Sequence, residues 1–260
     1  MRFTLFPRFS SLQPALACIA VSILAAAPSK AVATGIIMPI FGNTTAQFDA
    51  AVAAAQKVSM IAIINPDEGP GSKKVGGITS QVTRLRSAGA TVVGYVATGF
   101  GSQSLSSVKA QIDKHVAWYS VSGIFLDEMS DQTSKLSYYR SLYNYAKSKG
   151  LKVVGNPGTF VPSGYSAVAD VLVTYEDFVS NGWTKQKPST WTHAFPPSKI
   201  AAIVYNVSAA GKKAVMDRAI SLKYGWIYVT DGTGDDPFKK ASSYLSVEAN
   251  YIYTMNGYKK

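Results

Sequence analysis

Residues 121–129 read Val-Ser-Gly-Ile-Phe-Leu-Asp-Glu-Met, a short apolar run that ends in two adjacent carboxylates. A run of this length without polar alternation is typical of a parallel strand that is covered on both faces. Seven further runs of this kind occur along the chain, at residues 34–41, 58–66, 90–98, 151–157, 169–176, 200–207 and 225–231. The eight runs predict a parallel sheet with buried faces.

Longer amphipathic stretches separate most of these runs and predict helices, at residues 46–57, 77–88, 106–119, 134–149, 209–223 and 238–255. Gly89 and Gly150 stand where helix C-caps are expected. Eight strand–helix units in about 230 residues predict an α/β protein, a single (β/α)8 TIM-type barrel over residues 34–260. Only residues 158–168 separate the fifth and sixth runs, so the fifth helix is expected to be short or missing. An open, doubly wound sheet is the alternative fold.

The first 33 residues have the layout of a secretory signal peptide. Arg2 and Arg8 precede an apolar stretch over residues 12–27, and residues 31–33 form an Ala-Val-Ala cleavage signal. The apolar stretch is shorter than a comfortable membrane span, although a retained anchor is the alternative. We therefore expect residues 1–33 to be cleaved and the protein to be secreted, either extracellular, periplasmic or at the cell surface, with no stable membrane insertion.

The composition excludes several classes of protein. Hydrophobic residues make up 47% of the chain and aromatic residues 12%, which excludes disorder for most of it. The single cysteine, Cys18, excludes a disulfide scaffold and a multi-cysteine metal site within one chain. Removal of the leader takes away three basic residues and lowers the net charge from +11 to +8. The remaining basic residues occur as scattered pairs without interleaved aromatics, so we expect no nucleic-acid partner and a monomer with a solvated basic surface.

Carboxylates close two of the predicted strands. Asp127 and Glu128 end the fourth strand, and Glu176 ends the sixth. Barrel enzymes place their chemistry at the C-terminal ends of the strands, and glycoside hydrolysis needs one carboxyl group as acid and another as nucleophile or base. We predict that these three residues are catalytic; helix capping or pairing with a lysine is the structural alternative. Consecutive strand residues point to opposite faces, so only one of Asp127 and Glu128 is expected to meet the substrate directly.

The other strand ends supply polar and aromatic candidates for contact with a substrate: Asn65, Tyr95, Asn156, Tyr205 and Asp231. Two histidines complete the inventory of chemistry-bearing residues. His115 lies inside a helical pattern and His193 in a proline-rich connection, so neither is expected at a strand end. We therefore predict no His-based triad, no metal site and no cofactor.

Four motifs in order resemble the spherulin-4 (spherulation-specific) family. They are residues 65–71 (Asn-Pro-Asp-Glu-Gly-Pro-Gly), 94–101 (Gly-Tyr-Val-Ala-Thr-Gly-Phe-Gly), 123–128 and 156–159 (Asn-Pro-Gly-Thr). The resemblance implies a (β/α)8 barrel and, for members of known activity, endo-acting hydrolysis of α-1,4-linked galactosamine or N-acetylgalactosamine in exopolysaccharide. It maps the family's acidic pair onto Asp127 and Glu128 and its later glutamate onto Glu176. The Asp67-Glu68 pair departs from the Asn-Ser that is more frequent in the family, and an altered loop at the cleft rim is expected there.

The sequence therefore predicts a secreted endo-acting glycoside hydrolase with a polysaccharide substrate. In an α-linked 2-acetamido galactoside the acetamido group lies cis to the leaving oxygen, so it is unable to attack the anomeric carbon from behind. The enzyme must then provide its own nucleophile or base. The alternatives are a non-catalytic carbohydrate-binding or structural cell-surface barrel and a hydrolase of another glycan.

Overall fold

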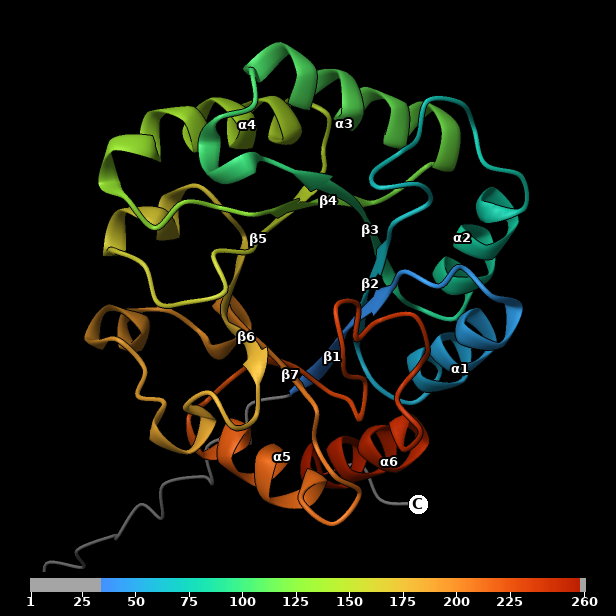
Figure 1. The fold of residues 1–260 in the computed structure, drawn as a ribbon, viewed down its shortest axis with the longest axis vertical. Coiled ribbons are helices and arrows are strands. Elements are labelled where there is room, and N and C mark those ends of the chain that lie inside the picture. Colours follow the sequence, from blue (N-terminus) through green and yellow to red (C-terminus); the bar gives the residue numbers. More distant parts are fainter. Residues whose placement is uncertain (1–33, 258–260) are drawn as a thin grey trace, which may run out of the picture. The chain divides into compact units, whose positions relative to one another are not determined.

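The computed structural model describes residues 34–257, which form a closed barrel of eight parallel strands in sequence order (Figure 1). The strands are β1 (Gly35–Ile40), β2 (Met60–Ile64), β3 (Thr91–Ala97), β4 (Gly123–Asp127), β5 (Lys152–Gly155), β6 (Val171–Phe178), β7 (Ile200–Tyr205) and β8 (Trp226–Val229). β8 pairs with β1, with Gly35 opposite Trp226, and this pairing closes the sheet. The predicted barrel is confirmed and the open sheet is excluded; the predicted leader, residues 1–33, lies outside the described residues.

Six α-helices surround the described barrel (Figure 1): α1 (Thr45–Ala55), α2 (Ile78–Ser87), α3 (Leu105–Tyr119), α4 (Leu136–Ser148), α5 (Lys212–Ser221) and α6 (Leu245–Met255). Local sequence sets their ends. Thr44 and Ser104 cap α1 and α3, because their side chains accept hydrogen bonds from backbone N–H groups of the first turn. Gly89 and Gly150 follow α2 and α4 with φ of 94° and 73°, the left-handed conformation that ends a helix at little cost in glycine. Among the described residues no helix is both long and apolar enough to cross a membrane.

Two crossovers lack an α-helix. The fifth, as predicted, holds only the 3-10 turn η3 (Ser163–Ala167). The sixth, which the sequence reading did not single out, holds three such turns, η4 (Trp183–Lys185), η5 (Thr190–Ala194) and η6 (Pro197–Lys199). Prolines at 188, 196 and 197 interrupt this segment, and proline removes a helical hydrogen-bond donor and disfavours helix in the residue before it.

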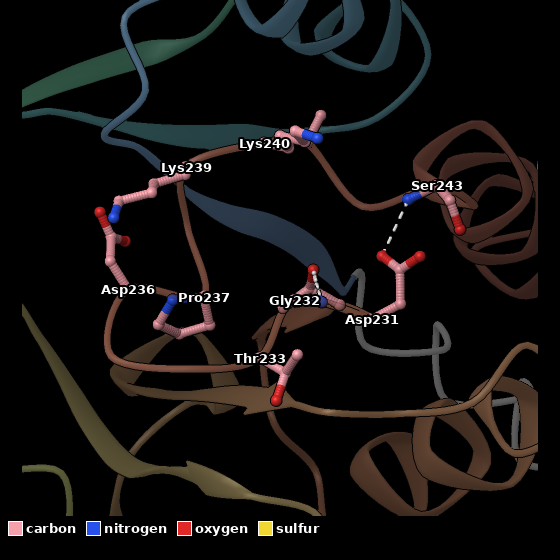
Figure 2. Close-up of a pocket in the computed structure, with 10 residues that line it drawn as sticks. Asp231, Gly232, Thr233, Asp236, Pro237, Lys239, Lys240 and Ser243 are labelled. Atoms are coloured by element: carbon pink, nitrogen blue, oxygen red, sulfur yellow. Dashed lines mark hydrogen bonds between the residues drawn. The ribbon is translucent and has the colours of Figure 1, made fainter.

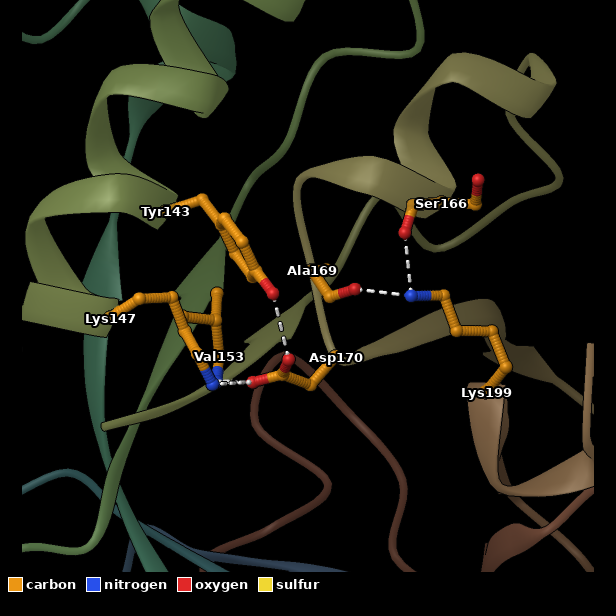
Figure 3. Close-up of polar contacts among 7 residues, drawn as sticks. All are labelled: Tyr143, Lys147, Val153, Ser166, Ala169, Asp170 and Lys199. Atoms are coloured by element: carbon orange, nitrogen blue, oxygen red, sulfur yellow. Dashed lines mark hydrogen bonds and ion pairs between the residues drawn. The ribbon is translucent and has the colours of Figure 1, made fainter. Parts of the chain in front are cut away.

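Polar contacts tie the elements around the short fifth crossover together (Figure 3). Asp170 accepts hydrogen bonds from the Tyr143 hydroxyl (3.0 Å), the Lys147 ammonium (3.0 Å) and the Val153 backbone N–H (2.8 Å). Lys199 donates to the backbone carbonyls of Ser166 and Ala169, at the end of η3. These charged hydrogen bonds link α4, β5, η3 and η6 where a packed helix is missing.

The last helix begins later than the sequence pattern predicts. The prediction started it at residue 238, whereas α6 begins at Leu245 and residues 230–244 form a loop. This loop is held against β1 and α1, since Gln47 donates to the Phe238 carbonyl at 2.7 Å. A Cβ on Gly42 would lie 2.0 Å from the Lys239 carbonyl oxygen, so only glycine admits the loop at this distance. These tertiary contacts override the helical periodicity of the segment.

Candidate active site

Left-handed backbone gathers at one end of the barrel. Five non-glycine residues with positive φ follow strands β1, β2, β3, β4 and β7 respectively: Asn43, Glu68, Phe100, Glu128 and Asn206. Such conformations are costly outside glycine, least so in asparagine, and they cluster at functional sites. The C-terminal ends of the strands therefore form the candidate functional face of the barrel.

Two of the predicted acids meet at this face through one amide. The Asn156 side-chain nitrogen donates to Asp127 Oδ1 at 2.7 Å and also to Glu176 Oε2. The amide oxygen of Asn156 accepts from the Gly158 backbone N–H at 3.0 Å, and this contact fixes which end of the amide faces the acids. Asp127 ends β4, Asn156 follows β5 and Glu176 lies on β6, so three neighbouring strands build the group. The structure thus brings Asp127, Asn156 and Glu176 together.

A β-bulge aims Glu176 at this group. The register of β6 against β7 shifts between Val173 and Tyr175, so that one extra residue lies on β6. Thr174 consequently hydrogen-bonds Tyr224, and Tyr175 packs against Trp183, which itself packs against Tyr224. Two consecutive side chains therefore face the same outer layer, and Glu176 is the next to point inward. With regular alternation Glu176 would share the outward face of Thr174.

The environment separates the two carboxyl groups in proton affinity. Burial raises the pKa of Glu176 to about 8, and the charge of Asp127 adds to the increase. Burial also raises the pKa of Asp127, but hydrogen bonds from Tyr95 and Asn156 favour its ionised form. Burial and the neighbouring Asp127 raise the pKa of Tyr95 well above its usual value, so its hydroxyl keeps the proton that it donates. Burial and a neighbouring charge thus favour protonated Glu176, while two hydrogen-bond donors favour ionised Asp127.

Glu128 points elsewhere, as expected for the second of two consecutive acids. It lies one residue beyond β4 with φ of 51°, and its Oε2 accepts from the Gly99 backbone N–H at 3.1 Å. This contact holds Glu128 beside the loop after β3, at the same end of the barrel as Asp127. Its side chain is exposed, in contrast to the bridged pair.

The remaining predicted residues are spread around the C-terminal end of the barrel, which we call the mouth. Asn65 braces the loop after β2, because its side-chain oxygen accepts from the Gly69 backbone N–H at 2.6 Å. Tyr205 ends β7, and burial together with the charge of Glu176 raises its pKa to about 12. Asp231 lies in a separate pocket of about 420 Å³, formed by the loop after β8 and lined also by Lys239 (Figure 2). There its carboxylate accepts from the Ser243 backbone N–H at 3.0 Å.

Aromatic side chains that the sequence reading did not single out complete the mouth. Phe41 packs edge-on against Tyr95, with ring centroids 5.4 Å apart, and against Phe238 at 5.5 Å. Phe238 in turn contacts Tyr205 at 5.9 Å. Phe41 closes the first predicted strand and was detectable as a strand-end residue. Phe238 was not, because it reaches the mouth from a segment that reads as helix.

The described residues hold no cluster of three or more histidine, cysteine, aspartate or glutamate side chains arranged for a metal ion. His115 is fully buried on α3, and its Nε2 lies 2.8 Å from the Tyr95 carbonyl oxygen. Burial lowers its pKa to about 4, so the ring is neutral and donates this hydrogen bond. His115 thus supports the backbone of β3 behind Tyr95, and His193 lies exposed in η5.

Fold and site together define a (β/α)8 barrel with a bridged pair of carboxyl groups at the C-terminal ends of β4 and β6. Comparison with known proteins gives the family. The family described as spherulation-specific family 4 matches residues 37–252. Spherulin-4 of Physarum polycephalum is 35% identical over 234 residues, which cover 85% of this chain and 70% of that protein. The chain belongs to the spherulation-specific family 4.

Solved structures share the barrel. The crystal structure of Aspergillus clavatus Sph3 in complex with GalNAc superposes with a TM-score of 0.72 at 20% identity, over 85% of this chain and 97% of that one. The spore cortex-lytic enzyme SleL of Bacillus megaterium gives a TM-score of 0.52 at 12% identity, over 86% of this chain and 75% of that one. At these identities the likeness concerns the fold.

Proposed function

We propose that this protein is an endo-acting glycoside hydrolase of α-1,4-linked galactosamine or N-acetylgalactosamine polymers, with no cofactor. The observation that carries the proposal is the Asp127–Asn156–Glu176 bridge, in which one carboxyl group has a pKa raised to about 8. A pair of carboxyl groups with separated proton affinities is what acid-assisted cleavage of a glycosidic bond requires. Membership of spherulation-specific family 4, and the GalNAc bound in the Sph3 crystal structure, support the choice of sugar.

In the proposed reaction Glu176 donates its proton to the glycosidic oxygen while Asp127 attacks the anomeric carbon. The bond from the anomeric carbon to the leaving oxygen breaks and a glycosyl ester to Asp127 forms. Ionised Glu176 then takes a proton from water, whose oxygen displaces Asp127 and releases the sugar with a new reducing end. The aspartate is regenerated ionised and the glutamate protonated, so the cycle closes without a further reactant.

The spacing of the two acids supports net retention of configuration. Both carboxyl oxygens contact a single nitrogen, so these two oxygens lie within two hydrogen-bond lengths of each other, about 6 Å at most. Inverting enzymes separate their carboxyl groups by roughly 6.5–9.5 Å to admit a water molecule, and retaining enzymes by about 5–5.5 Å. The cis arrangement of an α-linked 2-acetamido group closes the substrate-assisted route and leaves Asp127 as the nucleophile.

Glu128 and the other residues at the mouth receive supporting roles in this proposal. Glu128 lies beside the pair and contacts a neighbouring part of the glycan, while Tyr95 and Asn156 hold Asp127 ionised. Tyr205, Asn65 and Asp231 line the cleft or brace its loops. The proposal also includes secretion after cleavage of residues 1–33 and action as a monomer without a nucleic-acid partner.

The test is incubation of the protein with fully acetylated and with partially deacetylated α-1,4-galactosaminoglycan. Release of reducing ends as a ladder of oligosaccharides is the expected result, and NMR of the first products should show the α-anomer. Binding without release would instead favour a non-catalytic carbohydrate-binding protein. Release of reducing ends only from a different polysaccharide would support the proposed reaction but show that the proposed substrate is wrong.

A further inference from the structure

Phe100 occupies a strained and exposed position at the rim of the candidate active site. Residues 99–101, Gly-Phe-Gly, have φ of 56°, 55° and 76°, so three consecutive residues adopt the left-handed conformation. Glycine adopts it freely at the two flanks. For a bulky side chain at the centre it is a genuine outlier, at a cost of order 1–3 kcal/mol. The chain thus keeps a phenylalanine where glycine or asparagine fits the backbone better.

Packing does not account for this phenylalanine. Its side chain is 64% exposed, the highest value among the large apolar residues that are exposed in residues 34–257; the other two, Val247 and Met255, lie on α6. A single exposed apolar residue is ordinary on a protein surface. An exposed aromatic residue that also strains the backbone does not stabilise the folded state. Backbone strain of this kind is frequent at ligand-binding sites.

The surrounding contacts hold Phe100 rigidly beside the acids. Its backbone N–H donates to the Glu128 carbonyl at 2.8 Å, and the Gly99 N–H donates to the Glu128 carboxylate at 3.1 Å. The Thr98 hydroxyl donates to the same Glu128 carbonyl at 2.7 Å, and Lys135 donates to the Gly101 carbonyl at 3.0 Å. The turn after β3 is therefore fastened to the residue that follows Asp127.

We propose that Phe100 is a sugar-stacking platform, which forms a binding subsite for a pyranose ring of the glycan beyond the ring cleaved at Asp127 and Glu176. Pyranose rings present apolar C–H faces that pack on aromatic rings, and burial of this exposed face provides free energy on binding. The subsite rests on the proposed function and adds to it a reason for endo action, because it engages a sugar distant from the cleaved bond. A rigid platform costs little ordering entropy when the chain binds.

The test uses Phe100→Asn, which removes the ring and gives the left-handed position a residue that tolerates it. A sugar platform predicts opposite shifts: the melting temperature rises, while KM for the polymer increases about tenfold and kcat changes little. Phe100→Tyr should restore the affinity, since it keeps the aromatic face. Lys223→Asn is the matched control, because Lys223 also has positive φ (61°) and lies exposed before β8, away from the strand ends. The Lys223→Asn variant should have a higher melting temperature and an unchanged KM.

Binding measured in the Glu176→Gln background separates this proposal from the proposed function. With galactosaminoglycan oligosaccharides of increasing length, Phe100→Asn should weaken binding of the longer ones and leave that of the monosaccharide unchanged. Equal affinities with and without Phe100 for every length would overturn the platform, even where the wild-type protein hydrolyses the polymer. A wild-type protein that binds but does not hydrolyse would overturn the proposed function and leave the platform to be judged by this length dependence alone.

Discussion

Asp127 and Glu176 accept hydrogen bonds from the same amide nitrogen, that of Asn156, although they come from strands β4 and β6. The amide group holds the two acids close together while the strand between them keeps their backbones apart. Burial and the charge of Asp127 keep Glu176 protonated near neutral pH, and two donors favour the ionised form of Asp127. This asymmetry gives each carboxyl group its own part in the proposed reaction and leads to the first three predictions.

Replacement of Glu176 by Gln should lower kcat on galactosaminoglycan by at least about a thousandfold, because no proton reaches the leaving oxygen. The melting temperature at pH 8 should not fall, since the substitution removes a buried carboxyl group that resists ionisation. Reducing-end release and a thermal melt are the two measurements. Asp113→Asn, which neutralises an exposed carboxylate on α3, is the control and should retain normal turnover. Near-normal turnover of the glutamine variant would remove Glu176 from the mechanism.

The pH dependence of kcat/KM should fall on the alkaline side as Glu176 loses its proton, with an apparent pKa of about 8. The same ionisation should also affect stability. The folded state holds the Glu176 proton at pH values where the unfolded chain has released it, so this residue makes folding less favourable as the pH rises from 4.5 towards 8. Denaturant melts between pH 6.5 and 8, above the range in which His115 has the opposite effect, should show the stability of the wild type falling with rising pH and a smaller fall in Glu176→Gln. If Glu176→Gln leaves the alkaline limb of the profile at the same pH, then another group causes that limb.

Replacement of Tyr95 by Phe should move the acid limb of the same profile to higher pH. The Tyr95 hydroxyl favours the ionised form of Asp127, so its loss raises the pKa of that carboxyl group and reduces the fraction of active nucleophile at low pH. We expect the pH profile of kcat/KM to show this shift while the alkaline limb keeps its place. A uniform loss of activity at every pH would indicate that Tyr95 contacts substrate instead.

Strand ends, read from the sequence, located much of this site. Asp127, Asn156 and Glu176 all close apolar runs, and in a closed parallel barrel such positions converge on one face. The inward aim of Glu176 was not readable, because the bulge at Thr174 and Tyr175 has no glycine or proline to mark it. The place of Phe238 was not readable either, since contacts of its loop with Gln47 and Gly42 override the helical pattern. Local sequence pattern thus predicts the strands and most helices, whereas the positions of Glu176 and Phe238 depend on long-range packing.

Replacement of Asp170 by Asn should destabilise the protein by about 1–3 kcal/mol, because it weakens charged hydrogen bonds from three donors around the helix-free fifth crossover. Asp113 is a close match: it also pairs with a lysine and accepts from a tyrosine hydroxyl, Tyr145, but its side chain is 49% exposed against 27% for Asp170. Asp113→Asn should therefore cost less than about 1 kcal/mol. Urea unfolding of both variants makes the comparison, and equal losses would contradict a structural role for the Asp170 contacts.

His115 should make the protein less stable as the pH falls below about 6.5. Burial lowers the pKa of its ring to about 4, whereas an exposed histidine in the unfolded chain titrates near its usual 6.5. Between these two values the unfolded chain binds a proton that the folded state does not. The contribution of His115 to the free energy of unfolding therefore falls with decreasing pH, by on the order of 3 kcal/mol, and opposes the contribution of Glu176 above pH 4.5.

His115→Gln tests this dependence, because glutamine keeps a donor for the Tyr95 carbonyl oxygen but does not titrate. Its free energy of unfolding is expected to be lower than that of the wild type at pH 7, since the side chain fills the space beside Gly94 less completely, and this difference should narrow as the pH falls from 6.5 to 4. His193→Gln, at the exposed histidine of η5, should leave the slope of the wild type unchanged. A difference between His115→Gln and the wild type that stays constant from pH 6.5 to 4 would contradict the prediction, because it would mean that the ring binds protons equally well in the folded and the unfolded chain.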